Sequence, residues 1–249
     1  MELLDIILLS LIQGLTEWLP ISSSGHLVLA QELFNMQVPI YYDILLHFAT
    51  LIVILLVFYK DIYKIIKELL KLNFKNEYAK LGIYIMRASI PTAIIGFTFK
   101  DLFLSFYTNI NAVAISLLIT GLILLSTKFF HGKRKLTTFD SILIGVAQGL
   151  AIIPGISRSG STISTSLILG IRKELAIKFS FLLAIPAILG ATILEYTPAA
   201  INLEILLGIF ITIITGYLSL KLTINLILKD KFHYFSIYCF ILGIIILII

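Results

Sequence analysis

The chain has 249 residues, of which 59% are hydrophobic and only 13% are charged, and its mean hydropathy is +1.05. Soluble domains carry roughly 25% charged residues and about 45–50% apolar residues, so this composition excludes a soluble globular protein. The length allows one membrane domain with several spans, because each span needs about 20 apolar residues to cross about 30 Å of hydrocarbon. It leaves no room for a separate soluble domain. Cys239 is the single cysteine, which excludes an intrachain disulfide.

The net charge of +5 comes from lysines and arginines that lie between apolar runs and not in one patch. The positive-inside rule predicts four basic cytoplasmic loops, at 60–80, 128–135, 172–178 and 229–231. The nearly charge-free segments 100–109 and 197–202 are expected outside. The excess of basic residues therefore reflects the orientation of the chain in the membrane. It implies membrane lipids as a partner, and no nucleic-acid partner is expected.

In chain order, the first element is an N-terminal stretch, residues 1–43, that is interrupted at Pro20. It lacks the basic region of a cleaved signal peptide, so we expect it to stay in the mature protein. Apolar runs follow at 44–59, 81–99, 112–127, 141–170, 179–196, 203–228 and 234–249. These runs predict an all-α, polytopic membrane fold of one domain, with spans within 44–127 and three more within 179–249.

Two elements do not fit a simple crossing of the membrane. Residues 141–170 begin and end at predicted cytoplasmic loops and are interrupted at Pro154-Gly155, so we expect them to enter the membrane and return. Because 44–59 is expected to run from outside to inside, residues 1–43 begin and end outside. We therefore expect two re-entrant hairpins that enter from opposite faces.

The two interrupted segments resemble each other at a fixed offset of 135 residues. The matches are Gln13-Gly14-Leu15 with Gln148-Gly149-Leu150, Ile21-Ser22 with Ile156-Ser157, and Ser24-Gly25 with Ser159-Gly160. With the predicted topology the two copies are inverted. In that arrangement broken helices meet near the midplane of the membrane and form a binding site.

Each copy offers polar groups at its break. In QGLTEWLPISSSGH, residues 13–26, the i and i+4 spacing places Gln13 and Glu17 on one helical face, and three serines and His26 follow the break at Pro20. In PGISRSGST, residues 154–162, small hydroxyl residues surround Arg158 and a new helix begins. Free backbone N–H groups, a helix N-terminus and a guanidinium favour anion binding.

Glu17 and Arg158 are the strongest candidates, because a charge at membrane depth costs at least about 2.5–3.5 kcal/mol and is seldom kept without a function. Single Ser and Thr residues more often serve helix packing, and Trp18 is expected to pack or to anchor at the interface. Weaker candidates are Asp43, His47, Arg87, Gln148 and Glu195, which either line the site or pair with neighbours.

These two motifs, with YDILLH (residues 42–47) and FSFLLAIP (residues 179–186), resemble the undecaprenyl pyrophosphate phosphatase family of the BacA type over essentially the whole chain. The resemblance implies an enzyme of the cell membrane that hydrolyses undecaprenyl or another polyprenyl diphosphate to the monophosphate. This recycles the lipid carrier for cell-envelope glycan synthesis and confers bacitracin resistance. By motif position, the implied catalytic residues are Glu17, Ser23, His26 and Arg158. The implied phosphate-binding residues are Gln13, Ser22, Ser24, Gly25, Ser157, Ser159, Gly160, Ser161 and Thr162.

The resemblance also implies a divalent cation, Mg²⁺ or Ca²⁺, with Glu17 as a ligand. Gln13 stands where many members carry Glu, and since an amide cannot ionise, we expect weaker metal binding here. Two nucleophiles remain open: Ser23, activated by His26 or Glu17, and a water held by the same base.

A transporter or flippase for a lipid phosphate is the main alternative, because secondary transporters also place inverted repeats with broken helices at the midplane. The density of catalytic groups around Ser23 favours the enzyme. We expect the site to open to the outer face, from which the first hairpin enters. The oligomeric state is left open, a homodimer included.

Overall fold

The computed structural model describes residues 2–36, 38–130, 132–194 and 202–248, and within them the chain is helical, with no strand and one isolated backbone bridge. The first half contains α1 (Leu3–Trp18), α2 (Ser23–Leu33), α3 (Ile40–Leu70), α4 (Glu77–Thr98), α5 (Lys100–Tyr107), α6 (Ile110–Ser126) and the 3-10 turn η1 (Thr127–Phe129). The second half contains α7 (Thr138–Leu150), α8 (Arg158–Ile168), α9 (Lys173–Leu194), α10 (Leu203–Leu228), the 3-10 turn η2 (Phe232–Tyr234) and α11 (Phe235–Ile248). The all-α prediction is confirmed.

Five of the described helices are long and apolar enough to cross a membrane: α3, α4, α6 continued by η1, α9 and α10. Their outer faces carry large apolar side chains. On α10, for example, Leu206, Phe210 and Ile214 recur every four residues and are 51%, 60% and 45% exposed. In water this exposed apolar surface would be costly, whereas acyl chains solvate it without penalty.

The basic segment 60–80 is not a loop, which corrects the prediction. α3 continues through a distortion at Phe58 to Leu70, and α4 begins at Glu77, so only residues 71–76 connect them. The lysines alternate with Ile65 and Leu69, which pack against α4 at Gly82. Lysine and glutamate are good helix formers, so the charge pattern marks where the apolar zone ends and not where the helix ends.

The same correction applies to the predicted loop 172–178, which is helical from Lys173 onward. The segment 100–109, which was predicted only to face outside, contains the short helix α5. Of the predicted outer segment 197–202, the structure describes only Asn202, and the last two residues of the predicted span 179–196 also lie outside the described residues.

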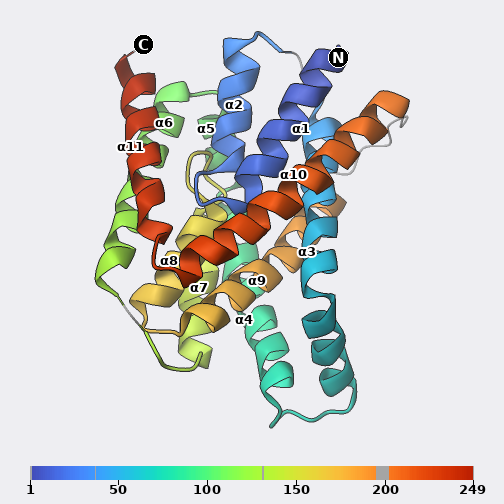
Figure 1. Cartoon of the computed structure of the whole chain (residues 1–249), viewed down its shortest axis with the longest axis vertical. Helices are drawn as coiled ribbons and strands as arrows, with labels where there is room; N and C mark the ends of the chain where they lie inside the picture. Colours follow the sequence, from blue (N-terminus) through green and yellow to red (C-terminus); the bar gives the residue numbers. More distant parts are fainter. Residues whose placement is uncertain (1, 37, 131, 195–201, 249) are drawn as a thin grey trace.

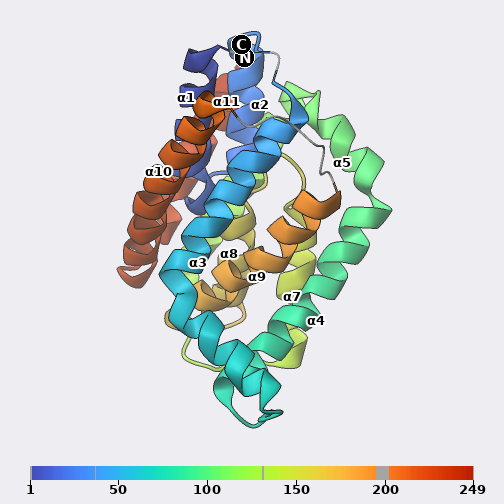
Figure 2. The ribbon, with the colours of Figure 1, turned by 90° about the vertical axis from the view of Figure 1, so that its right-hand side faces the viewer.

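The helices pack in reciprocal pairs across the two halves of the chain. α1 packs along α10, α7 packs along α4, and α6 packs along α11. Glycines permit the first two contacts: Gly14 lies against Thr212 and Thr215 of α10, and Gly145 lies against the backbone of Ala88 in α4. Figures 1 and 2 show α1 and α2 at the end that carries both termini, and α7 and α8 nearer the opposite end.

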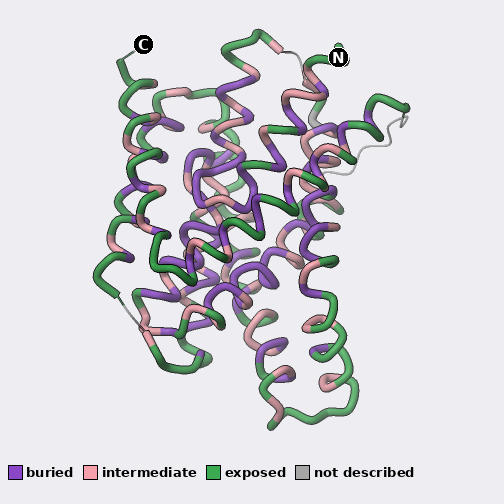
Figure 3. The backbone as a smooth tube through the Cα atoms, viewed as in Figure 1, coloured by how far each residue is buried: buried purple, intermediate pink, exposed green. Residues whose placement is uncertain are grey.

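The interior of the protein lies where these pairs meet. Figure 3 shows buried residues concentrated in the middle of the molecule, whereas the connected ends of α3 and α4 are largely exposed.

The loop residue Arg134 joins the start of α7 to the end of α8. Its guanidinium donates to both carboxylate oxygens of Asp140 at 2.6 and 2.8 Å and to the carbonyl of Leu169 at 2.6 Å. These bonds hold α7 and α8 side by side.

Candidate active site

The site lies where the break between α1 and α2 meets the break between α7 and α8. Proline explains the first break: α1 ends at Trp18, two residues before Pro20, which lacks the N–H that a helix needs. α2 restarts at Ser23, with Ser22 as its N-cap. The second break spans 151–157 and contains Pro154. Both breaks were predicted at these positions from the sequence, and both are confirmed.

A direct hydrogen bond joins the two breaks. The Ser22 hydroxyl accepts from the backbone N–H of Gly155 at 3.0 Å and from that of Gly25 at 3.3 Å. Ser22 holds a left-handed φ of 68°, which is unfavourable for a serine, and Gly155 has a φ of 93°. A Cβ on Gly25 would lie 3.1 Å from the Cα of Gly155. A side chain at Gly25 would thus be tight against the other break, and a Cβ on Gly155 would lie only 2.5 Å from the Val113 carbonyl oxygen of α6.

The second break is held in a matching way. Ser157 caps α8 by accepting from the N–H of Gly160 at 3.0 Å, as Ser22 caps α2. Thr120 of α6 donates its hydroxyl to the carbonyl of Gly155 at 2.8 Å and accepts from the N–H of Ser157 at 3.1 Å. Thr120 lies in an ordinary apolar span, so nothing in the sequence motifs indicated this role.

Glu17 is the centre of the cluster, and it is buried. Its Oε1 accepts a hydrogen bond from Nη2 of Arg158, in an ion pair that joins α1 to α8. Its Oε2 accepts from the Ser23 hydroxyl at 2.5 Å and from the Gln13 amide at 3.0 Å. The structure thus brings together Glu17, Ser23 and Arg158, three of the four residues that the motifs indicated as catalytic.

Arg158 retains capacity for a further anion. Its guanidinium carbon lies 5.4 Å from the centroid of the Trp18 ring, and its Nη1 is buried without a hydrogen-bond partner among the described residues. A buried, unpaired guanidinium N–H is costly unless a ligand occupies it. Trp18 was expected to be a packing residue, and in part it is, because its ring also meets Phe181 edge-on. Its position under Arg158 was not predicted.

His26 lies differently from the prediction. Its Nδ1 is 2.7 Å from the carbonyl oxygen of Ser22, and its Nε2 is 2.7 Å from the hydroxyl of Tyr238 in α11. Both ring nitrogens are therefore occupied, and of the two bases suggested for Ser23 only Glu17 contacts it. His47, a weaker candidate, comes close to the cluster, since its Nε2 lies 3.8 Å from Oε2 of Glu17.

Comparison with known proteins identifies the family. The model of the family described as bacitracin resistance protein BacA matches residues 6–245. The chain belongs to this family. Three relatives, each named undecaprenyl-diphosphatase, are similar along nearly their whole length. They come from Alkaliphilus metalliredigens (44% identity, 97% of this chain and 96% of the relative), Carboxydothermus hydrogenoformans (43%, 98% and 95%) and Korarchaeum cryptofilum (40%, 99% and 99%).

Membership in the BacA family and the five candidate spans establish a multi-pass membrane protein.

The other residues that the motifs indicated lie in or next to the two breaks and bond to groups there. Ser24 lies 3.2 Å from the Ser22 hydroxyl, Ser159 donates to the carbonyl of Leu19 at 3.3 Å, and Thr162 pairs with Ser180 and with the carbonyl of Arg158. Ser161 is buried in the first turn of α8.

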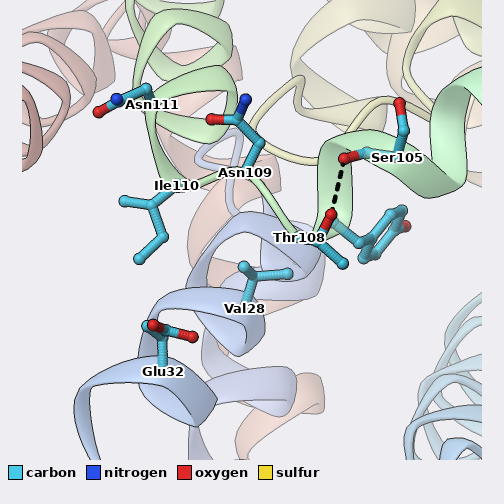
Figure 4. A pocket seen from close by; sticks show the side chains of 8 residues that line it. Val28, Glu32, Ser105, Thr108, Asn109, Ile110 and Asn111 are labelled. Carbon is cyan, nitrogen blue, oxygen red and sulfur yellow. Dashed lines mark hydrogen bonds between the residues drawn. The ribbon is translucent and has the colours of Figure 1, made fainter.

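The remaining weak candidates bond to neighbours outside the cluster. Asp43 accepts from the amide of Gln31, Gln148 donates to Thr92 and to the carbonyl of Leu183, and Arg87 donates to Thr138. Glu195 lies outside the described residues. A cavity of about 430 Å³ between α2, α5 and α6 is lined by other polar residues, among them Glu32, Ser105, Thr108 and Asn109, and by none of the cluster residues (Figure 4).

The protein groups in the cluster do not fit a divalent cation by themselves. Among the described residues, Glu17 is the one carboxylate that bonds to Ser23 and Arg158, and both of its oxygens already accept hydrogen bonds. Across the described residues, no group of three or more His, Cys, Asp or Glu side chains is placed to hold a metal. Mg²⁺ sites commonly use one or two carboxylates together with substrate phosphates, so a cation here would need ligands from the substrate.

Proposed function

We propose that this chain is a phosphatase that hydrolyses undecaprenyl diphosphate, or another polyprenyl diphosphate, to the monophosphate and inorganic phosphate. This activity recycles a lipid carrier for cell-envelope glycan synthesis and confers resistance to bacitracin. The observation that carries the proposal is the buried contact of the Glu17 carboxylate with the Ser23 hydroxyl and the Arg158 guanidinium. The names of the full-length relatives supply the substrate.

Arg158 is the residue that receives the diphosphate in this mechanism. Phosphoryl transfer is catalysed mainly by positioning and by neutralising charge on the phosphoryl oxygens. The unpaired Nη1 of Arg158 binds such an oxygen, and the N-terminus of α8, which begins at Arg158, adds its positive helix end. As Arg158 turns toward the phosphate, its ion pair with Glu17 weakens, and the carboxylate becomes a stronger base.

Glu17 then activates the nucleophile. The Ser23 oxygen attacks the terminal phosphorus while its proton moves to Oε2 of Glu17, and the bond to the bridging oxygen breaks, releasing the prenyl monophosphate. Glu17 passes this proton to the departing prenyl monophosphate. Water then attacks the phosphoserine and gives its proton to the free Glu17 carboxylate, which returns it to the Ser23 oxygen as inorganic phosphate leaves. In the alternative route, a water held by Glu17 attacks the same phosphorus directly, and Ser23 only orients the carboxylate.

The decisive experiment measures phosphate release by the purified protein in detergent from farnesyl and undecaprenyl diphosphate. It is run with added Mg²⁺ or Ca²⁺ and with a chelator. We propose that hydrolysis requires the cation and that the cation binds together with the diphosphate, since the protein groups alone do not form its site. Absence of phosphate release with either cation would contradict the phosphatase and favour a lipid transporter.

Ser23→Ala separates the two nucleophiles. If the serine is phosphorylated, we expect kcat to fall by about 10³-fold or more, because the first covalent step is removed. Acid quenching of the wild type with a substrate labelled at the terminal phosphate should trap label on the protein. Ser89→Ala is the matched control, since Ser89 bonds within its own helix at the carbonyl of Ile85. Substantial turnover by Ser23→Ala would eliminate the covalent route.

We also propose that α1–α2 and α7–α8 are re-entrant hairpins and that the two halves of the chain are inverted repeats. The supporting features are the reciprocal packing of α1 on α10 and of α7 on α4, and the equivalent serine caps of α2 and α8. The two hairpins approach the centre from opposite ends of the molecule (Figure 1). The site is proposed to open to the outer face, from which α1–α2 enters.

Cysteine labelling tests this topology. In a Cys239→Ser background, single cysteines at the exposed positions Lys75 and Lys133 should be protected from a membrane-impermeant thiol reagent in intact cells. Cysteines at Asn35 and Thr108, also exposed, should react. The native Cys239 is fully buried, so its removal is expected to change labelling little. Labelling of Lys75 and Lys133 from opposite sides of the membrane would overturn the inverted repeat.

A further inference from the structure

A tyrosine outside both motifs contacts the histidine of the first one. Tyr238 in α11 and His26 in α2 lie 212 positions apart in the chain, yet the tyrosine hydroxyl is 2.7 Å from Nε2 of His26. Their rings are stacked, with centroids 5.7 Å apart and planes inclined by 10°. α11 packs along α6, and among the described residues none of the hydrogen bonds and ion pairs of Glu17 comes from α11.

The partners of His26 decide its tautomer. The carbonyl oxygen of Ser22 only accepts hydrogen bonds, so Nδ1 of His26 must carry the proton and donate it. Nε2 of the neutral ring is then an acceptor, and the Tyr238 hydroxyl donates to it. The hydrogen bonds thus run from Tyr238 through the imidazole to the backbone of Ser22.

The end of this chain of hydrogen bonds is the residue that joins the two breaks. Ser22 has the left-handed φ of 68°, and its hydroxyl accepts from Gly155 of the other break. Its carbonyl group is bonded directly to the nitrogen of Ser23, whose hydroxyl lies 2.5 Å from Glu17. Rotation of the Ser22 peptide would therefore move Ser23 relative to the carboxylate.

We infer that Tyr238 is a positioning residue for hydrolysis: it holds His26 in the Nδ1–H tautomer, and His26 in turn holds the Ser22 peptide so that Ser23 stays in contact with Glu17. This inference rests on the proposed function. It assigns His26 to orienting the nucleophile and not to removing its proton, and it adds to the site a residue from α11.

Tyr238→Phe tests the inference, because it keeps the stacked ring and removes only the hydroxyl. We expect kcat for the polyprenyl diphosphate to fall about tenfold to a hundredfold, because a small misplacement of a reacting group causes losses of this size. KM should change less than about twofold. The second readout is the nitrogen NMR spectrum of the protein labelled with ¹⁵N-histidine. The His26 signals, identified by their loss in His26→Gln, should change from one fixed tautomer to an exchanging mixture.

Tyr234→Phe is the matched control, since Tyr234 lies beside His233, with ring centroids 4.4 Å apart, and is exposed. It should leave kcat and the His26 signals unchanged. An unchanged His26 spectrum in Tyr238→Phe, or equal losses of kcat and of thermal stability without a change of tautomer, would overturn the inference. The spectrum is recorded without substrate, so failure of the proposed hydrolysis would appear separately, as absent phosphate release by the wild type.

Discussion

Arg158→Ala is expected to lower kcat/KM for polyprenyl diphosphate by about 10³-fold or more, the range seen when an arginine that stabilises a transferring phosphoryl group is removed. The reason is that Nη1 of Arg158 is a buried cationic donor without a hydrogen-bond partner among the described residues, and that its guanidinium also pairs with Glu17. Arg158→Lys should recover part of this loss, because an ammonium keeps the charge but not the planar pair of donors. Phosphate release at varied substrate concentration measures both variants.

The control for Arg158→Ala must separate catalysis from folding. Removing the guanidinium leaves the Glu17 carboxylate buried without its cation, which destabilises a protein by about 3–5 kcal/mol when the pair is fully buried. The double variant Glu17→Gln with Arg158→Ala removes that unpaired charge. It should regain thermal stability in detergent but not activity. A single Arg158→Ala variant that keeps activity within tenfold of the wild type would contradict the assigned role.

Glu17→Gln is expected to lower kcat by about 10²–10⁴-fold, the usual contribution of a general base. Glutamine has nearly the same shape and still accepts a hydrogen bond from Ser23, but it cannot take the proton. Substrate binding should be retained or become tighter, because Arg158 is released from its ion pair with Glu17. Equilibrium binding of a non-hydrolysable polyprenyl diphosphate analogue, measured beside phosphate release, checks both halves of this expectation.

Glu77→Gln is the matched control, since the Glu77 side chain is 69% exposed and forms a surface ion pair with Lys135. Such pairs contribute about 0–1 kcal/mol, so activity and binding should stay near those of the wild type. If Glu17→Gln lost substrate affinity and kept kcat, Glu17 would be a binding residue and another residue would have to be the base. The next candidate would be His47, whose Nε2 lies 3.8 Å from Oε2 of Glu17.

The features that sequence reasoning predicted are those governed by local chemistry. Pro20 and Pro154 mark the two breaks because proline lacks an N–H and because small polar residues follow both of them. Pro91 and Pro186, which lie in apolar runs, stay inside α4 and α9. Glu17 and Arg158 stood out because charges at membrane depth are costly, and the structure pairs them. The prediction of a loop at 60–80 was wrong because the charges there mark only where the apolar zone ends. Helix propensity and the packing of Ile65 on α4 extend the helix beyond that point.

Composition and spacing therefore indicated a helical membrane protein with two interrupted segments and made Glu17 and Arg158 the strongest candidates for one site, while the family resemblance added Ser23. Only the tertiary structure decided which base touches Ser23. Glu17 and His26 lie on either side of the same helix break, and the direction of each side chain there depends on a helix distant in sequence: α8 for Glu17 and α11 for His26. Trp18, Thr120 and Tyr238 acquire their roles in the same way, through contacts that no local pattern records.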